Sequence, residues 1–102
     1  MRVGIRMRMA LVASCLALLQ AVAGADTTRA PEQIFASTCG WCHHKGGREA
    51  GKGPRLMGTS LSDAEIAFRI RKGKQGYMPA FEGAFSDAEM RGLVTYIRNL
   101  KR

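Results

Sequence analysis

Two cysteines and a histidine within the five-residue run Cys39-Gly40-Trp41-Cys42-His43 constrain this sequence more than any other feature. A Cys-x-x-Cys pair followed at once by His is the attachment pattern of a c-type haem. Both thiols can reach one edge of the porphyrin, while the imidazole reaches the iron. The run therefore predicts one covalently attached haem c, with Cys39 and Cys42 as thioether sites and His43 as the proximal iron ligand.

Other interpretations of this cysteine pair are less favoured. A thioredoxin-like redox pair needs a surrounding strand–helix–strand framework, which is not visible in so short a chain. A zinc site needs four ligands, and close neighbours such as Cys42, His43 and His44 cannot surround one ion in a relaxed tetrahedron. A simple disulfide, which exported proteins often form, is the remaining alternative beside a chance match.

The first 25 residues have the pattern of a secretory signal peptide. A basic start with three arginines is followed by an apolar run over residues 9–23 and by the small residues Ala23-Gly24-Ala25. This order of charge, apolar segment and small residues is typical of export and removal by cleavage. We therefore expect residues 1–25 to be cleaved, residues 26–102 to form the mature domain, and the protein to reside in the periplasm.

Retention at a membrane is the alternative for this N-terminal segment. A helical anchor needs about 20 apolar residues, whereas residues 9–23 amount to only 15. The segment Val12-Ala13-Ser14-Cys15 also loosely resembles the cleavage box of a lipoprotein. The apolar run continues past Cys15 to Leu19, however, so cleavage there would divide the signal. Export without a lipid or membrane anchor is the preferred interpretation.

The expected mature domain is small and basic. It has 77 residues, with 13 Lys and Arg against 8 Asp and Glu, and hence a net charge of about +5. A domain of this size usually needs additional support, because its apolar core barely offsets the loss of conformational entropy. A central haem would provide that support. The positive charge favours redox protein partners with acidic surfaces, whereas nucleic acid is a poor partner for an exported protein.

The periodicity of apolar residues predicts an all-α fold with three main helices and long loops. The first helix is expected over about 31–38, with a proline in its first turn. The second begins at Ser62 and stops at Gly73, and the third begins at Ser86 and continues to the basic residues 98–102. The second and third both start with Ser-Asp-Ala-Glu, which is a capping box. No segment alternates convincingly as a strand.

A second iron ligand is sought among the methionines of the mature chain. His44 directly follows the proximal His43 and cannot reach the opposite face of a haem. Met90 lies on the apolar stripe of the third helix, where core packing is the better interpretation. Met78 is favoured, because the proline after it restrains its backbone to an extended conformation between two helices. Met57, which follows His43 by 14 residues, is the competing candidate.

The proximal histidine also needs a partner for its second ring nitrogen. A metal-binding histidine usually donates that N–H to a carbonyl or carboxylate, which fixes its tautomer. The dipeptide Gly53-Pro54 lies in the loop after the motif. Proline stiffens such a loop and has no N–H of its own to compete, so this dipeptide is the candidate acceptor.

With these features in place, the sequence resembles the short class I cytochromes c of bacteria and algae over nearly all of residues 31–101. Beside the haem motif, the resemblance rests on one aromatic residue and three further segments: Phe35, Gly53-Pro54-Arg55-Leu56, Met78-Pro79-Ala80-Phe81 and Leu93-Val94-Thr95-Tyr96-Ile97. It implies a small helical fold wrapped around one haem c. It also implies Cys39 and Cys42 as thioether sites, with His43 and Met78 as axial ligands.

The resemblance carries two structural implications and one departure. It implies that the Pro54 carbonyl accepts from His43, and that the first and third helices cross with Phe35 near Tyr96. The family often has a glycine four residues before that aromatic, which permits close helix approach, whereas this chain has Pro31 there. The geometry of the crossing is therefore the open point.

An iron with two protein ligands has no open site for a substrate, so these features predict an electron-transfer protein and not an enzyme. We expect a monomeric periplasmic carrier that shuttles single electrons between redox partners through a His/Met-ligated haem. A haem-bearing subunit of a stable periplasmic oxidoreductase complex is the alternative. A ligand sensor or peroxidase-like protein would require Met78 to leave the iron. A positive docking face, or else a generally solvated basic surface, is expected from eight cations: Lys45, Arg48, Lys52, Arg55, Arg69, Arg71, Lys72 and Lys74.

Overall fold

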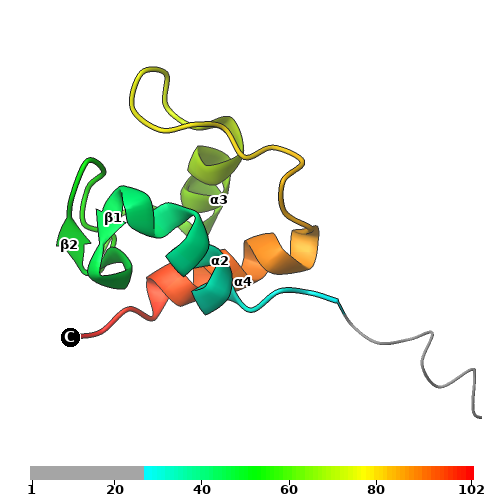
Figure 1. Cartoon of the computed structure of the whole chain (residues 1–102), viewed down its shortest axis with the longest axis horizontal. Coiled ribbons are helices and arrows are strands. Elements are labelled where there is room, and N and C mark those ends of the chain that lie inside the picture. The colour runs from blue at the N-terminus through cyan, green and yellow to red at the C-terminus, as the bar shows by residue number, and fades with distance from the viewer. Residues whose placement is uncertain (1–26) are drawn as a thin grey trace, which may run out of the picture.

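The structure is a computed structural model, and it describes residues 27–102. The predicted signal peptide and its cleavage site lie outside these residues. Within them, three α-helices are joined by long loops (Figure 1), in agreement with the predicted all-α class. The elements in chain order are α2 (Pro31–Ser37), the 3₁₀ helix η1 (Cys39–Trp41), β1 (His43–His44), the 3₁₀ helix η2 (Lys45–Gly47), β2 (Glu49–Ala50), α3 (Asp63–Lys72) and α4 (Asp87–Arg98).

These α-helices begin at the residues where their starts were predicted. Pro31 occupies the first turn of α2, where a backbone N–H would have no helical partner. Before α3, the Ser62 side chain accepts from the Glu65 N–H at 3.2 Å, and the Glu65 carboxylate accepts from the Ser62 N–H at 2.7 Å. Ser86 and Glu89 form the same reciprocal pair before α4, at 3.1 and 3.0 Å. Both predicted capping boxes are confirmed.

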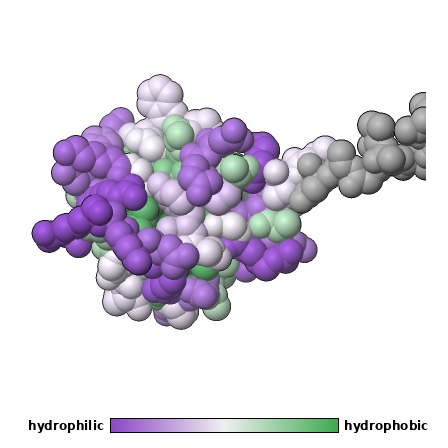
Figure 2. All heavy atoms as spheres, turned by 90° about the horizontal axis from the view of Figure 1, so that it is seen from below, coloured by the Kyte–Doolittle hydropathy of each residue, from purple (hydrophilic) through white to green (hydrophobic). Residues whose placement is uncertain are grey.

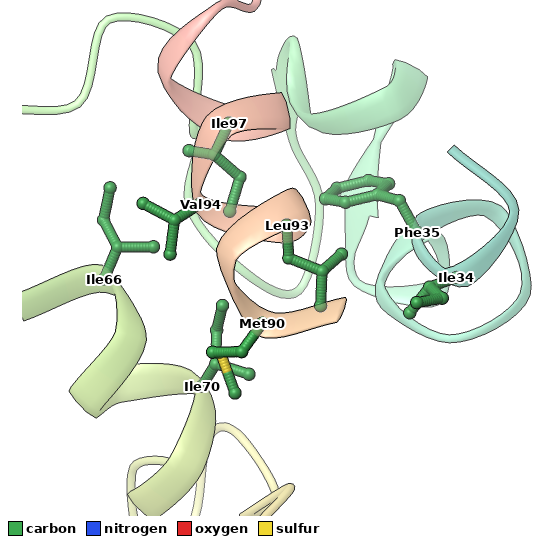
Figure 3. Packing of buried hydrophobic residues seen from close by; sticks show 8 residues of the cluster. All are labelled: Ile34, Phe35, Ile66, Ile70, Met90, Leu93, Val94 and Ile97. Atoms are coloured by element: carbon green, nitrogen blue, oxygen red, sulfur yellow. The ribbon is translucent and has the colours of Figure 1, made fainter. Parts of the chain in front are cut away.

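Helix α4 is the centre of the hydrophobic core, because it packs against both α2 and α3. Figure 3 shows Leu93 of α4 beside Phe35 of α2, whereas Met90 and Val94 lie toward the two isoleucines of α3. Leu93 and Phe35 are each only 1% exposed. The apolar stripe predicted on the third helix is therefore confirmed, and Met90 is a core residue.

The crossing of α2 and α4 brings two aromatic rings together. The ring centroids of Phe35 and Tyr96 lie 5.0 Å apart, with their planes tilted by 38°, a favourable aromatic arrangement. At the start of α2, a glycine on α4 lets the two helices approach each other closely. A Cβ on Gly92 of α4 would lie 3.7 Å from the Pro31 ring. The helices thus cross as expected, with the glycine on α4 opposite the proline of α2.

A short antiparallel ladder follows the cysteine pair, although no strand was predicted there. Strand β1 pairs with β2, so that His43 lies opposite Ala50 and His44 opposite Glu49. That prediction was wrong because strands of two residues are too short to show an alternating pattern. The ladder turns the chain back directly after Cys42, and it thereby determines where the following loop lies.

The turn inside this ladder depends on glycine. Residues Lys45, Gly46 and Gly47 have φ values of +49°, +66° and +97°, in the region that glycine adopts most readily. A Cβ on Gly47 would lie 2.9 Å from the Leu100 side chain and 3.2 Å from the Phe35 ring. The turn therefore packs directly against α2 and against the residues after α4.

The third helix is shorter than predicted, since it ends at Arg98 and does not continue to residue 102. Leu100 nevertheless stays buried, with 8% of its surface exposed. Just beyond it, the Arg48 Nε donates to the Lys101 carbonyl at 2.6 Å. These contacts are made with the turn after the cysteine pair, and a continued helix would lose them.

Candidate haem-binding site

The cysteine pair lies on the short 3₁₀ helix that follows α2. The Cys42 N–H donates to the Cys39 carbonyl at 3.2 Å, so the two cysteines share one turn of the chain. Both residues are half-buried. Cys39 also packs against the buried core cluster. A group attached at Cys39 would therefore border the apolar interior.

The environment of Cys39 disfavours the other interpretations of the motif. Burial raises the pKa of its thiol to about 11, because an apolar environment penalises the thiolate. Thioredoxin-like pairs work with a lowered cysteine pKa. Within residues 27–102, moreover, no group of three His, Cys, Asp or Glu side chains is arranged to hold a metal ion. The raised pKa of the Cys39 thiol therefore argues against a redox-active dithiol.

His43 is buried and has one polar partner. The residue is 8% exposed, and its Nδ1 atom lies 2.7 Å from the Pro54 carbonyl oxygen. Because a carbonyl oxygen only accepts, Nδ1 is the donor, and in the neutral ring Nε2 is then the nitrogen with the lone pair. The ring is therefore held in the tautomer that offers Nε2 to a metal.

The backbone beside this imidazole leaves no room for a side chain. A Cβ on Gly53 would lie 2.5 Å from Cε1 of His43 and 2.9 Å from Nδ1, which is closer than real Cβ contacts. The Gly53 N–H also donates to the Cys42 carbonyl at 2.9 Å. The loop thus runs directly along the cysteine–histidine motif and supports the ring with backbone atoms.

Met78 lies in the loop between α3 and α4. Its N–H donates to the Lys74 carbonyl, and the Lys74 N–H donates to the Met78 carbonyl, both at 2.8 Å. Gly73 permits this closure, since a Cβ there would lie 2.5 Å from the Met78 carbonyl oxygen. Met78 is half-buried and packs against the same apolar cluster as Cys39. The candidate distal ligand and one candidate thioether site therefore border one core.

The two other methionines of the expected mature chain occupy different surroundings. Met90 is 7% exposed and lies inside the core. Met57 follows Pro54 in the loop that supports His43, and its N–H donates to the Gly47 carbonyl at 3.0 Å. Met78 is thus the methionine whose place in the fold is separate from both the core helix and the loop behind His43.

Some of the basic residues near the site are paired with acidic side chains. Lys45 lies 3.1 Å from Glu49, and Lys72 lies 2.8 Å from Glu82. On the face of the molecule shown in Figure 2, polar residues are widely spread and apolar residues form only small separate spots. The positive charge expected around the site is therefore partly compensated at these two positions.

Two aromatic residues adjoin the candidate ligands in sequence, and their exposure was not predicted. Trp41, next to Cys42, is 78% exposed, and its indole N–H donates to the Ser37 carbonyl at 3.2 Å. Tyr77, next to Met78, is 79% exposed. Large apolar side chains usually bury more of their surface, so both are available for contact with another molecule.

An ion pair between Arg29 and Glu89 was not predicted from the sequence. The Arg29 Nε lies 2.6 Å from the Glu89 carboxylate. This bond, together with the Ser86 N–H, lowers the pKa of Glu89 to about 2. The capping box identified Glu89 as a helix-start residue, but nothing in the sequence links it to an arginine 60 positions away.

Fold and site together describe a small helical protein with candidate donors for one haem: the thiols of Cys39 and Cys42, the Nε2 of His43 and the thioether of Met78. The sequence matches, over residues 26–97, the family described as Cytochrome C oxidase, cbb3-type, subunit III. It is also 32% identical over 72 residues to Cytochrome c6 of Euglena gracilis, with 63% of this chain and 82% of the relative covered. No solved structure matches the chain significantly.

The chain belongs to the family of small single-haem class I cytochromes c. Its cofactor is haem c, which is attached covalently and carries iron. Proteins of these families transfer electrons. In the part of the chain that the structure describes, no helix has the length and apolar character needed to span a bilayer.

Proposed function

We propose that the protein is a periplasmic carrier that passes single electrons between redox partners, with its haem iron bound by His43 and Met78. The bound haem supplies a reversible one-electron change at iron. The contact between His43 Nδ1 and the Pro54 carbonyl carries this proposal, because it leaves Nε2 as the free ring nitrogen. Cys39 and Cys42, on the preceding turn, are the proposed thioether sites.

The surroundings of Met78 support its role as the second ligand. Its side chain packs against the apolar core, and its backbone is bonded to Lys74 in both directions. With its thioether and the His43 imidazole both bound to the iron, the residues present would leave no open position for a substrate, which suits electron exchange. A methionine ligand together with an apolar shell raises the reduction potential, which suits a carrier that accepts electrons readily.

A partner with an acidic surface is proposed on the basis of net charge. The expected mature chain carries an excess of five positive charges (13 Lys and Arg against 8 Asp and Glu). Complementary charge speeds encounter and keeps binding weak, as a shuttle requires. Lys45 and Lys72 are engaged by neighbouring carboxylates. Lys52 and Lys74 are exposed, and we expect them to contribute more to the encounter.

The family description favours a second candidate, a haem-bearing subunit of a stable oxidoreductase complex, because it names an oxidase subunit. The two candidates differ in what is purified from the native source. A free carrier elutes at the size of one chain, whereas a subunit elutes with its enzyme. The apolar spots on the face shown in Figure 2 are small and separate, which favours the free carrier.

Optical spectra of the matured protein in both redox states test the proposed ligation. A weak band at the red end of the ferric spectrum reports a sulfur–iron bond, and we expect it in the wild-type protein. Met78→Ala should abolish the band, and Met57→Ala is the matched control that should retain it. A band that survives Met78→Ala and disappears in Met57→Ala would overturn the assignment of the distal ligand. Cyanide binding by the wild-type ferric protein as tight as that of Met78→Ala would contradict a closed iron.

A further inference from the structure

The chain uses the same capping sequence twice, in two different environments. Ser62-Asp63-Ala64-Glu65 precedes and starts α3, and Ser86-Asp87-Ala88-Glu89 does the same for α4. The Glu65 carboxylate is exposed and accepts from the serine N–H of its own box. Glu89 is 8% exposed, and its carboxylate accepts from its serine and also three times from Arg29. Helix capping alone therefore does not account for the burial of Glu89.

Arg29 lies in the segment before α2 and holds Glu89 through both its side chain and its backbone. Its Nε donates to Oε2 at 2.6 Å, its Nη2 to Oε1 at 3.3 Å, and its backbone N–H to Oε2 at 3.2 Å. Hydrogen bonds between charged partners are stronger than neutral ones, and the forked geometry makes them specific. The pair therefore attaches the segment before α2 to the first turn of α4.

The same arginine contacts the loop that carries Met78. Its Nη2 donates to the Ala84 carbonyl at 3.4 Å, and its guanidinium lies 5.7 Å from the centre of the Phe85 ring. The Phe85 ring stacks on Phe81, with 5.6 Å between centroids. Phe81 is three residues beyond Met78, so the contacts of Arg29 extend through two aromatic rings to the methionine segment.

We propose that Arg29 and Glu89 are positioning residues that hold the loop bearing Met78 in its ligating conformation, an inference that rests on the His/Met ligation proposed above. Just beyond Met78, the loop is bonded to α3, where the Phe81 N–H donates to the Ile70 carbonyl at 3.0 Å. The end of the loop next to α4 is held by the ion pair and by the ring of Phe85. Without the pair, that end loses its anchor while the backbone bonds around Met78 stay in place.

A looser loop makes the open form of the site more populated. A ligand that competes with Met78 binds only when the methionine has left, so its apparent affinity rises in proportion to the open fraction. Imidazole is a suitable probe, because it is a small nitrogen ligand whose binding to ferric haem is followed optically. We therefore expect Arg29→Ala and Glu89→Gln to strengthen imidazole binding to the ferric holoprotein about tenfold.

Two matched controls separate this effect from a general loss of stability. Glu65→Gln makes the same substitution in the other capping box, whose carboxylate has no arginine partner among the described residues. Arg98→Ala removes the 2.8 Å ion pair with Asp63, which joins α4 to the start of α3 and does not touch the methionine loop. Both should leave imidazole affinity within about twofold of wild type, even where urea unfolding shows a loss of stability. Arg29→Lys keeps the charge without the fork and should restore part of the wild-type behaviour.

The outcomes distinguish the two levels of the proposal. Wild-type imidazole affinity in both Arg29→Ala and Glu89→Gln, with the red-end band intact, would overturn the positioning role alone. An equal gain of affinity in Arg98→Ala would also overturn it, because general destabilisation would then explain the effect. A wild-type protein without the band would overturn the proposed ligation and this inference with it. Should Arg29→Ala fold poorly, hydrogen exchange on Glu89→Gln decides, with faster exchange at the Phe81 and Ala84 amides expected.

Discussion

The Nδ1 atom of His43 lies 2.7 Å from the carbonyl oxygen of Pro54, eleven positions further along the chain. This contact is possible because Gly53 brings its backbone against the ring, where a Cβ would come within 2.5 Å of Cε1. The position of the imidazole is thus a property of the loop as much as of the motif. A substitution in this loop should therefore affect haem binding by moving the His43 ring, even though it replaces no proposed ligand.

Gly53→Ala tests this dependence. The added methyl cannot fit beside the ring, so we expect the loop to shift and the protein to lose about 1–3 kcal/mol of unfolding free energy. We also expect a lower yield of protein carrying covalent haem, measured by the haem absorbance per mole of chain. Gly92→Ala is the control, because its methyl would meet only ordinary contacts at 3.7 Å. Equal stability and haem content in Gly53→Ala and wild type would show that the loop tolerates the methyl.

Gly92→Ala should itself stabilise the protein. The residue lies in the interior of α4, where glycine is about 1 kcal/mol less favourable than alanine. Because the nearest Pro31 atoms lie 3.7 Å from where the alanine Cβ would stand, the crossing with α2 is preserved. Urea unfolding followed by far-ultraviolet circular dichroism should give a higher midpoint with an unchanged slope. A lower midpoint would mean that α2 and α4 are closer than this contact distance indicates.

Tyr96→Phe isolates one hydrogen bond at the helix crossing. The Tyr96 hydroxyl donates to the Gly46 carbonyl at 2.8 Å, while its ring packs on Phe35. Loss of the hydroxyl should reduce the unfolding free energy by about 1 kcal/mol and leave the ring contact intact. Tyr77→Phe, at an exposed position, is the matched control and should change stability little. If both variants unfold at the same urea concentration as wild type, the hydroxyl contributes nothing measurable.

The Arg29–Glu89 pair should contribute to the loss of folding stability at low pH. The pKa of Glu89 is lowered to about 2 from an ordinary value of 4.5, first by Arg29 and then by the Ser86 N–H. Since the folded-state pKa is the lower one, protonation favours the unfolded chain. The contribution is therefore present above pH 4.5 and is lost as the pH falls toward 2.

Glu89→Gln should consequently flatten the fall of the thermal midpoint as the pH is lowered from 4.5 to 2. Glu65→Gln serves as the control, because the pKa of Glu65 is lowered only by contacts within its own capping box. We expect the Glu65 variant to keep most of the acid dependence of the wild type. Parallel curves for wild type and Glu89→Gln would mean that other carboxylates dominate the acid transition.

Local signals explain why much of the fold was predictable from the sequence. Each Ser-Asp-Ala-Glu box starts a helix through bonds made within four residues, so α3 and α4 begin where expected. The cysteine motif likewise predicts its own geometry, because the thiols and the histidine are neighbours. Distant contacts were not predictable from local patterns, and the one that was expected, between Phe35 and Tyr96, came from the family resemblance. The end of α4 depends on Arg48 holding Lys101, which no periodicity reveals.

In the candidate site, too, the residues close to the motif in sequence were predictable, whereas a contact from a distant residue was not. The loop position of Gly53-Pro54 indicated this dipeptide as the acceptor for His43, and the family resemblance implied the Pro54 carbonyl. Arg29 was not connected with the methionine loop, because its partner Glu89 lies 60 positions away and was already explained by capping. Because the capping box already accounts for Glu89, the sequence gives no indication that its carboxylate also binds Arg29. The ligation by Met78 stays a prediction until the optical spectra of its alanine variant are recorded.

The placement of α4 at the centre of the core has a consequence for biogenesis. Chains emerge from the ribosome N-terminus first, so residues 39–43 are made long before residues 87–98. Until α4 arrives, Phe35 and Leu56 lack the core against which they pack, and the two thiols belong to an unpacked nascent segment. A chain that is exported before it folds would therefore offer accessible cysteines for haem attachment, and packing of α4 onto the core would then cover the attached edge.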